Sequence, residues 1–188
     1  MILTISGEPG SGKTSVAKII ASKLGMNFYS IGSLRGKMAL ERGMTINELN
    51  ALGEREAFTD TTVDDYQREL GKKEDNFIIE GRLSWHFIPQ SFKVFLTCDP
   101  KEAARRIFLA RQKESEDRGD EPSYASPEEA EKEIAARIAS DVLRYQKYYG
   151  LDYRDPSHYD VVIDTTQKNG PEDTAAMLLD ELKQRGRA

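Results

Sequence analysis

Four short apolar runs interrupt a chain that is otherwise rich in polar and charged residues. They cover residues 2–6, 77–79, 94–96 and 161–163, and the last three are near-continuous in Val, Ile, Leu and Phe. Runs of this length and composition are typical of strands that are buried on both faces of a parallel sheet. The long segments between them have helical character, so strands and helices alternate. This alternation predicts a three-layer α/β fold.

A helical pattern begins a few residues after the first run. Ala17, Ile20, Ala21 and Leu24 recur at i, i+3, i+4 and i+7, which places them on one face of a helix. Gly25 follows directly and is well placed to end this helix. The chain therefore opens with a strand, a glycine-rich loop and a helix.

Two polar segments differ from this alternation. Residues 30–75 carry many charges and are expected to form about three short helices. Residues 111–127 contain Glu, Asp, Ser, Gly and Pro with few apolar residues, which is typical of an exposed loop or lid. A helix is expected to start there, with Ser126 as its N-cap, Pro127 at its first position and Glu129 completing a capping box.

Composition limits the classes of function that fit. The 188 residues suit a single domain, residues 1–188, and the formal net charge of −5 argues against a broad nucleic-acid-binding surface. Cys98 is the single cysteine, so no internal disulfide can form, which suits a reducing compartment. No segment approaches the roughly 20 apolar residues of a membrane span. We therefore expect a soluble cytoplasmic protein, by default a monomer, with neither nucleic acid nor membrane as partner.

The chemistry is concentrated in residues 7–14. They match G-x-x-x-x-G-K-[ST] in full, between an expected strand and an expected helix. Backbone N–H groups of such a P-loop surround phosphate oxygens, and its glycines allow close approach. Lys13 is expected to reach the β- and γ-phosphates of ATP, and the Thr14 hydroxyl to ligate Mg²⁺. The expected ATP-binding residues are Gly7, Glu8, Pro9, Gly10, Ser11, Gly12, Lys13 and Thr14.

Glu80, Gly81 and Arg82 follow the second apolar run. Ligands gather at the carboxyl ends of parallel strands, and an acid there helps to hold Mg²⁺ in nucleotide-binding folds. We therefore expect Glu80 and Thr14 to form the metal site, and Arg82 to clamp a second phosphate. A surface turn with a solvated arginine is the alternative.

A second candidate site comprises Ser30, Gly32 and Arg35. A hydroxyl, a glycine and an arginine so close together can bind an anionic, hydroxyl-rich small molecule. A helix N-cap followed by a surface arginine explains the same residues equally well.

Arg137, Asp141 and Arg144 form a charged row on one face of an expected helix, because they recur at i, i+4 and i+7. The row borders the apolar face of that helix, as suits residues that line a cleft. An ordinary row of intrahelical ion pairs is the alternative. The apolar face comprises Ile134, Ile138, Val142, Tyr145 and Tyr149.

Taken in order, these pieces resemble the cytidylate kinases, in particular the short form common in archaea, over nearly the whole chain. Glu80-Gly81-Arg82-Leu83 and Arg144-Tyr145-x-x-Tyr148-Tyr149-Gly150 are the more specific pieces, because all P-loop proteins share the motif at 7–14. The other similar pieces are Ser30 with Gly32 and Arg35, Arg137 with Asp141, and residues 159–165.

The resemblance implies phosphoryl transfer from ATP to CMP or dCMP, giving ADP and CDP or dCDP. It implies a P-loop NTPase fold with a central five-stranded parallel sheet, an acceptor-binding segment at about 30–75 and a lid at about 111–127. The ATP base would lie near the loop after Asp164. Because the acceptor is already an anionic phosphate oxygen, no general base is needed, and catalysis is positioning and charge stabilisation.

Residue roles also follow from the resemblance. Ser30, Arg35 and Arg82 would bind the acceptor phosphate and neighbouring groups, and Arg137 and Asp141 the sugar or phosphate. Arg144 would stabilise the moving phosphoryl group, so the expected catalytic residues are Lys13, Arg82, Arg137 and Arg144. Arg105 and Arg111 resemble lid arginines. Trp85 is expected to pack, with contact to the acceptor base as the alternative for Trp85 and His86.

Two other readings compete with this one. Another small-acceptor kinase of the same fold is possible, but the segment at 80–82 fits neither the adenylate nor the shikimate type. A non-catalytic ATP-binding module would keep residues 7–14 and dispense with the arginines. The joint presence of Arg35, Arg82, Arg137 and Arg144 argues against such a module.

Overall fold

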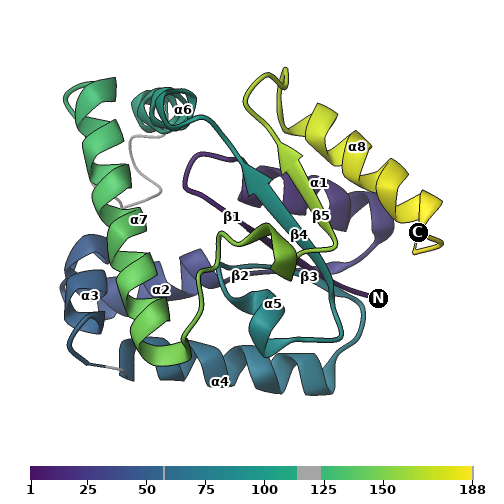
Figure 1. Ribbon diagram of the computed structural model, residues 1–188, viewed down its shortest axis with the longest axis horizontal. Helices are drawn as coiled ribbons and strands as arrows, with labels where there is room; N and C mark the ends of the chain where they lie inside the picture. The colour runs from purple at the N-terminus through teal and green to yellow at the C-terminus, as the bar shows by residue number, and fades with distance from the viewer. Residues whose placement is uncertain (57, 114–123, 188) are drawn as a thin grey trace.

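A sheet of five parallel strands forms the centre of the molecule (Figure 1). The computed structural model describes residues 1–56, 58–113 and 124–187. The strand order is β2-β3-β1-β4-β5, and every neighbouring pair is parallel. The predicted central five-stranded parallel sheet is therefore confirmed. The strands are β1 (Ile2–Gly7), β2 (Asn27–Ser30), β3 (Phe77–Glu80), β4 (Phe92–Thr97) and β5 (Val161–Asp164).

Helices cover both faces of this sheet, so the fold has the expected three layers (Figure 1). One face packs against α1 (Lys13–Leu24) and α8 (Pro171–Gln184). The other packs against α2, α4 and α5 and the carboxyl end of α7, and α6 lies beside α7. These other helices are α2 (Ile31–Glu41), α3 (Ile46–Gly53), α4 (Phe58–Lys73), α5 (Ser84–Phe87), α6 (Pro100–Lys113) and α7 (Pro127–Tyr149), with a 3₁₀ turn, η1, at Pro156–His158.

The side chains of the central strand β1 pack into both layers of the core. All of its residues are buried, and alternate side chains point to opposite faces. Leu3 and Ile5 enter the apolar layer under α1 and α8. On the other face, the Thr4 hydroxyl lies 2.9 Å from the Ser91 hydroxyl, and the Ser6 hydroxyl donates to the Arg82 carbonyl at 2.9 Å. The polar residues of β1 are therefore satisfied by hydrogen bonds inside the core.

The edge strands depart from the sequence prediction. Residues 161–163 were expected to be buried on both faces, but Val162 of β5 is 43% exposed. The prediction was wrong here because β5 is an edge strand that pairs only with β4, so the layers do not cover it fully. The opposite edge, β2, has no run of apolar residues and is only half-buried, so the apolar pattern did not reveal it.

The predicted helix ends are largely confirmed. Gly25 ends α1 with a positive φ of 62°, and its N–H donates to the Ala21 carbonyl. Ser126 is the N-cap of α7, and its hydroxyl accepts from the Glu129 N–H at 3.2 Å. In a capping box the Glu129 carboxylate would accept from the N–H of the N-cap residue itself. Here it accepts from the N–H of Ala125, one residue before the cap.

The two polar segments have different outcomes. Residues 30–75 contain three helices, α2, α3 and α4, as predicted. The expected lid at 111–127 falls mostly on residues 114–123, which lie outside the described residues. In the part of the chain that the structure describes, α6 ends at Lys113 and α7 begins at Pro127.

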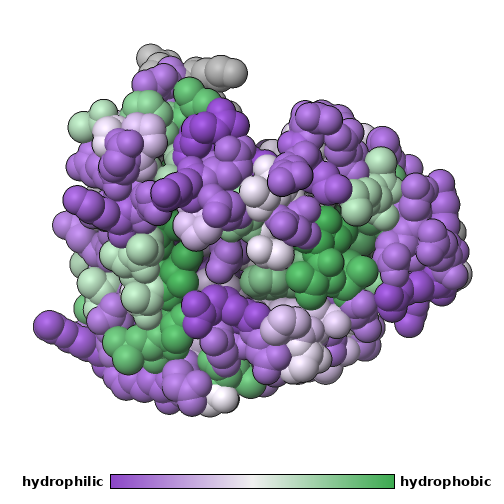
Figure 2. All heavy atoms as spheres, turned by 45° about the horizontal axis from the view of Figure 1, so that its top comes forward, coloured by the Kyte–Doolittle hydropathy of each residue, from purple (hydrophilic) through white to green (hydrophobic). Residues whose placement is uncertain are grey.

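The visible surface in Figure 2 is mainly hydrophilic, with hydrophobic residues in separate patches. Among the described residues, the large apolar side chains that are exposed come from different elements of the fold. No helix in the described ranges is long and apolar enough to cross a membrane. The exposed side chains are Leu40, Tyr66, Leu109, Leu143, Val162 and Met177.

Candidate active site

A cleft of about 710 Å³ opens where the strands end. Residues 9–16 form its floor, directly after β1, and residues 80–82 enter it from the end of β3. α6, α7 and the segment from the turn after β5 to the start of α8 supply most of the remaining walls, with single residues from α2 and α3. Segments that are far apart in the sequence meet here because parallel strands all deliver their carboxyl ends to one edge.

The glycines of the P-loop are required by close packing. A Cβ on Gly7 would lie 2.2 Å from the Leu96 carbonyl oxygen, and a Cβ on Gly10 would lie 2.7 Å from both Cβ and O of Ala103. The loop is therefore pressed against β4 and α6. Of the expected ATP-binding residues, Pro9 to Thr14 line the cleft, whereas Gly7 and Glu8 lie behind the lining.

Lys13 is held within the loop. Its ammonium donates to the Glu8 carbonyl at 2.7 Å. Burial, and then the nearby Arg82 and Arg137 guanidinium groups, lower the pKa of Lys13 to about 7. Burial is the larger of these causes, and an incoming polyphosphate would favour the charged form of the lysine.

The two expected metal ligands lie together. The Thr14 hydroxyl is 3.0 Å from both carboxylate oxygens of Glu80, which is buried. The Ser30 hydroxyl donates to the same carboxylate at 2.5 Å. A hydroxyl beside a carboxylate is the kind of oxygen donor set that Mg²⁺ takes, with water and phosphate oxygens completing its shell. The residues present therefore fit this ion.

Ser30 and Arg35 both have structural partners, and their role in binding an acceptor stays a prediction. The Ser30 hydroxyl accepts from the Ser33 N–H at 3.1 Å, so Ser30 is the N-cap of α2. Arg35 is buried instead of solvated, and it donates to the Thr59 carbonyl and to Asn50 Oδ1, both at 3.0 Å. In this conformation Arg35 joins α2 to the following helices and does not line the cleft.

The charged row on α7 is built around Asp141. This carboxylate is 2% exposed and forms ion pairs with Arg82 and with Arg144. Burial alone would raise the pKa of Asp141, but the Arg82 and Arg144 guanidinium groups outweigh burial and hold the pKa below its usual range. Arg82 and Arg137 line the cleft, whereas Arg144 is fully buried and, like Asp141, lies behind the lining.

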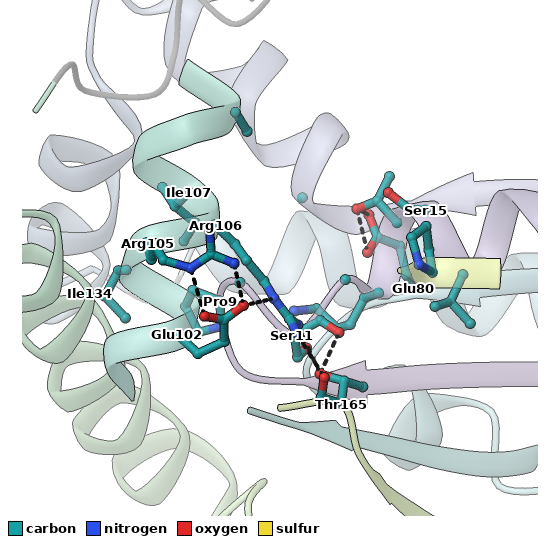
Figure 3. Close-up of a pocket in the computed structure, with 18 of the residues that line it drawn as sticks. Pro9, Ser11, Ser15, Glu80, Glu102, Arg105, Arg106, Ile107, Ile134 and Thr165 are labelled. Atoms are coloured by element: carbon teal, nitrogen blue, oxygen red, sulfur yellow. Dashed lines mark hydrogen bonds and ion pairs between the residues drawn. The ribbon is translucent and has the colours of Figure 1, made fainter. Parts of the chain in front are cut away.

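A second charged cluster lies on α6 (Figure 3), and of its members the sequence analysis singled out Arg105 but not Glu102 or Arg106. Arg106 donates to the Thr165 carbonyl at 2.8 Å and to the Thr166 carbonyl at 3.2 Å, and it pairs with Glu102 at 2.8 Å. Hydrogen bonds from Arg105 and then Arg106 lower the pKa of Glu102 to about 2. The spacing of Glu102 from both arginines was a readable helical signal, but nothing in the sequence linked Arg106 to residue 165.

The turn after β5 is joined to the P-loop as well as to α6. The Thr165 hydroxyl lies 3.2 Å from the Ser11 carbonyl oxygen and 3.0 Å from the Thr97 carbonyl oxygen. Lys168, Asn169 and neighbouring residues of this turn line the cleft. This is the region where the resemblance places the base of ATP.

Helix α3 is attached to α7. Asn47 of α3 donates to the Glu133 carboxylate at 3.2 Å, and both residues line the cleft. Further along α7, the Tyr148 hydroxyl donates to the Gly53 carbonyl at 2.7 Å. Arg105 and Arg111 line the cleft, whereas Trp85 and His86 do not.

Comparisons with solved structures support the fold. An uncharacterized protein from Eubacterium ventriosum matches with a TM-score of 0.69 at 17% identity, over 97% of this chain and 98% of that chain. The shikimate kinase from Acinetobacter baumannii matches with a TM-score of 0.60 at 18% identity, over 98% and 93%. At such low identity these matches show the fold alone.

Comparisons of sequence show the family. A cytidylate kinase from Methanocella arvoryzae is 37% identical over 185 residues, covering 97% of this chain and 99% of the relative. A cytidylate kinase from Methanothrix thermoacetophila is 37% identical over 165 residues, covering 88% of each. The model of the cytidylate kinase-like family matches residues 2–167. The chain therefore belongs to the cytidylate kinase-like family.

Proposed function

We propose that this protein is an ATP-dependent cytidylate kinase that converts CMP or dCMP, with ATP, to CDP or dCDP and ADP. The observation that carries the proposal is the meeting of a complete P-loop with Arg82 and Arg137 in one cleft. The relatives named cytidylate kinase, which share most of the chain, support the choice of acceptor.

In the proposed reaction, a phosphate oxygen of the acceptor attacks the γ-phosphorus of ATP. The bond from that phosphorus to the β–γ bridging oxygen breaks, and ADP leaves with the electron pair. The acceptor oxygen is already anionic, so the protein has no proton to remove. Its residues act by holding the two nucleotides in line and by neutralising the charge that moves between them.

Each residue role in this proposal rests on its position. Lys13 and the backbone of the P-loop bind the β- and γ-phosphates. Arg82 and Arg137 enter the same cleft and are placed to bind the acceptor phosphate and the moving phosphoryl group. Arg144 is fully buried, so we infer that it acts through Asp141 and not by touching the phosphoryl group.

Thr14 and Glu80 would hold Mg²⁺. When bound there, this ion would supply positive charge that offsets the charge of the ATP phosphates. Ser30 donates to the same carboxylate, so it would fix the side chain of Glu80. Asn47 and Glu133 line the acceptor side of the cleft, next to the helices that the resemblance assigns to CMP.

The decisive experiment measures initial rates of ADP formation with Mg-ATP and a parallel set of acceptors: CMP, dCMP, UMP, AMP, GMP and shikimate. We expect CMP or dCMP to react at least about tenfold faster than the others, a difference of about 1.4 kcal/mol in the transition state. Preference for a different acceptor would retain the kinase and reject the cytidylate assignment. Binding of ATP without stimulation by any acceptor would indicate a binding module.

A substitution links the rate to the P-loop. Lys13→Ala should abolish measurable turnover while the circular dichroism spectrum stays that of the wild type, because the lysine is the first residue of α1 and is not part of the apolar core. Full activity in this variant would contradict the assignment of residues 7–14 as the phosphate site.

A further inference from the structure

Trp85, the only tryptophan of the chain, lies directly behind the arginine that enters the cleft. Its side chain is 7% exposed and does not line the cleft. The indole N–H donates to the Arg82 carbonyl at 3.0 Å, and the Ser6 hydroxyl donates to the same oxygen at 2.9 Å. The carbonyl oxygen of Arg82 therefore accepts two hydrogen bonds, one from α5 and one from β1.

The indole ring is itself fixed by its neighbours. It stacks on the His158 ring with centroids 4.3 Å apart and planes 20° from parallel. It also meets the Tyr159 ring edge-on, at 5.6 Å and 66°. Both residues belong to the segment that connects α7 to β5. The position of the indole N–H is thus determined by packing from two parts of the fold.

The backbone before Trp85 is hydrogen-bonded and closely packed. The Gly81 N–H donates to the Ile5 carbonyl at 3.1 Å, and a Cβ at Gly81 would lie 2.4 Å from the Ser84 hydroxyl oxygen. At the other end of Arg82, the guanidinium pairs with the buried Asp141. The side chain of Arg82 is thereby held at both its backbone and its charged end.

We propose that Trp85 is a positioning residue, which fixes Arg82 through the hydrogen bond from its indole N–H to the Arg82 carbonyl and so prepares this arginine to bind the acceptor phosphate. The inference rests on the proposed function, because it needs an acceptor phosphate at Arg82. Preorganised donors act in catalysis because they need no reorientation when charge develops, and loss of one anchor should therefore reduce the contribution of Arg82.

The test is a double-mutant cycle. Trp85→Phe retains an aromatic ring and removes the N–H, and Arg82→Ala removes the group that Trp85 is proposed to position. A neutral hydrogen bond contributes a factor of roughly 2 to 10, so Trp85→Phe should lower kcat/KM for CMP about fivefold. The dissociation constant for ATP, measured without acceptor, should stay within about twofold. In the Arg82→Ala background, Trp85→Phe should change kcat/KM for CMP less than about twofold.

Other variants separate positioning from general stability. Ser6→Ala removes the second bond to the same carbonyl and should reproduce the effect of Trp85→Phe. Tyr29→Phe removes a hydroxyl that bonds to Glu74, away from the cleft, and should leave kcat/KM for CMP unchanged. An equal effect of Trp85→Phe in both backgrounds, or an equal loss of ATP affinity, would overturn the inference. Absence of wild-type turnover with every acceptor would overturn the proposed function, and this inference with it.

Discussion

The proposed donor and acceptor halves of the cleft are built in different ways. The donor half is a stretch of consecutive residues, 7–14, whose backbone is shaped by glycines packed against β4 and α6. The acceptor half is assembled from side chains of separate elements, with Arg82 after β3 and Asp141 on α7 joined by a buried ion pair. The first half depends on the space around a backbone, and the second on charge balance inside the core. Substitutions should therefore affect the two halves by different physical routes.

The largest effect is expected from Asp141→Ala. Loss of this carboxylate leaves the guanidinium groups of Arg82 and Arg144 buried next to each other without their shared counter-charge. Removal of one partner from a buried ion pair destabilises by about 3–5 kcal/mol. Equilibrium unfolding in urea should show this loss of free energy of unfolding.

A matched control exists on the surface. Asp152 pairs with Arg154 at 2.9 Å, but both side chains are about 40% exposed. Asp152→Ala should therefore change the free energy of unfolding by no more than about 1 kcal/mol. If the two aspartate variants lost equal stability, buried charge would not be what holds the acceptor half together.

Substitutions of glycines in the donor half should destabilise the protein by steric strain. Gly10 has a φ of 78°, which costs an L-residue about 1–2 kcal/mol, and a Cβ there would overlap the backbone of Ala103. Overpacking adds about 1–3 kcal/mol, so Gly10→Ala should lower the free energy of unfolding by roughly 3 kcal/mol. Gly12 has a similar φ of 84°, but no atom lies within 4 Å of a Cβ added there. Gly12→Ala therefore measures the cost of the backbone conformation alone.

Both glycine variants should be unfolded in urea without nucleotide, so that a ligand clash at the new methyl group plays no part. The expected result is that Gly10→Ala is clearly less stable than Gly12→Ala. Equal values would mean that the backbone conformation alone, and not the contact with α6, makes glycine necessary at position 10.

Arg106 tests whether the donor half also relies on side chains. It donates to the carbonyls of Thr165 and Thr166 in the turn that lines the cleft. Hydrogen bonds from a charged donor contribute about 1.5–3 kcal/mol, and part of this should appear in ATP affinity. We expect Arg106→Met to weaken ATP binding about tenfold in titration calorimetry, with the KM for CMP little changed.

The control for Arg106→Met is Arg185→Met at the C-cap of α8, where an arginine pairs with Glu181 outside the cleft. It removes the same charge and should leave ATP affinity unchanged. A larger effect of Arg106→Met on the KM for CMP than on ATP binding would show that this arginine serves the acceptor half. The turn at residues 165 and 166 would then belong to the acceptor half.

The same contrast explains what the sequence could and could not predict. The strand, loop and helix around residues 7–14 follow from local patterns, because the motif is contiguous. Thr14 and Glu80 were also paired correctly, because parallel strands bring their carboxyl ends together. β2 was not located, because a short half-buried edge strand has no clear apolar pattern.

The burial of two arginines could not be predicted from sequence. Contact of Arg35 and Arg144 with substrate stays a prediction, and in this structure their guanidinium groups contact Asn50 and Asp141 inside the core. A helical spacing shows which face a charge occupies, but not whether that face meets a cleft or another helix. Arg106 was missed for the same reason, since its partners at 165 and 166 become neighbours only in the folded chain.

The smallest expected effect concerns how the acceptor-side helices are attached. The Tyr148 hydroxyl donates to the Gly53 carbonyl at 2.7 Å, and so joins α7 to the end of α3 by one neutral bond. Tyr148→Phe should lower the free energy of unfolding by about 0.5–1.5 kcal/mol. Because α3 and α7 both border the acceptor side, the KM for CMP should rise slightly while ATP affinity stays constant. Tyr66→Phe, at an exposed position on α4, provides the control. A change in ATP affinity on Tyr148→Phe would show that the two halves of the cleft are coupled through α7, and that their different construction does not make them independent.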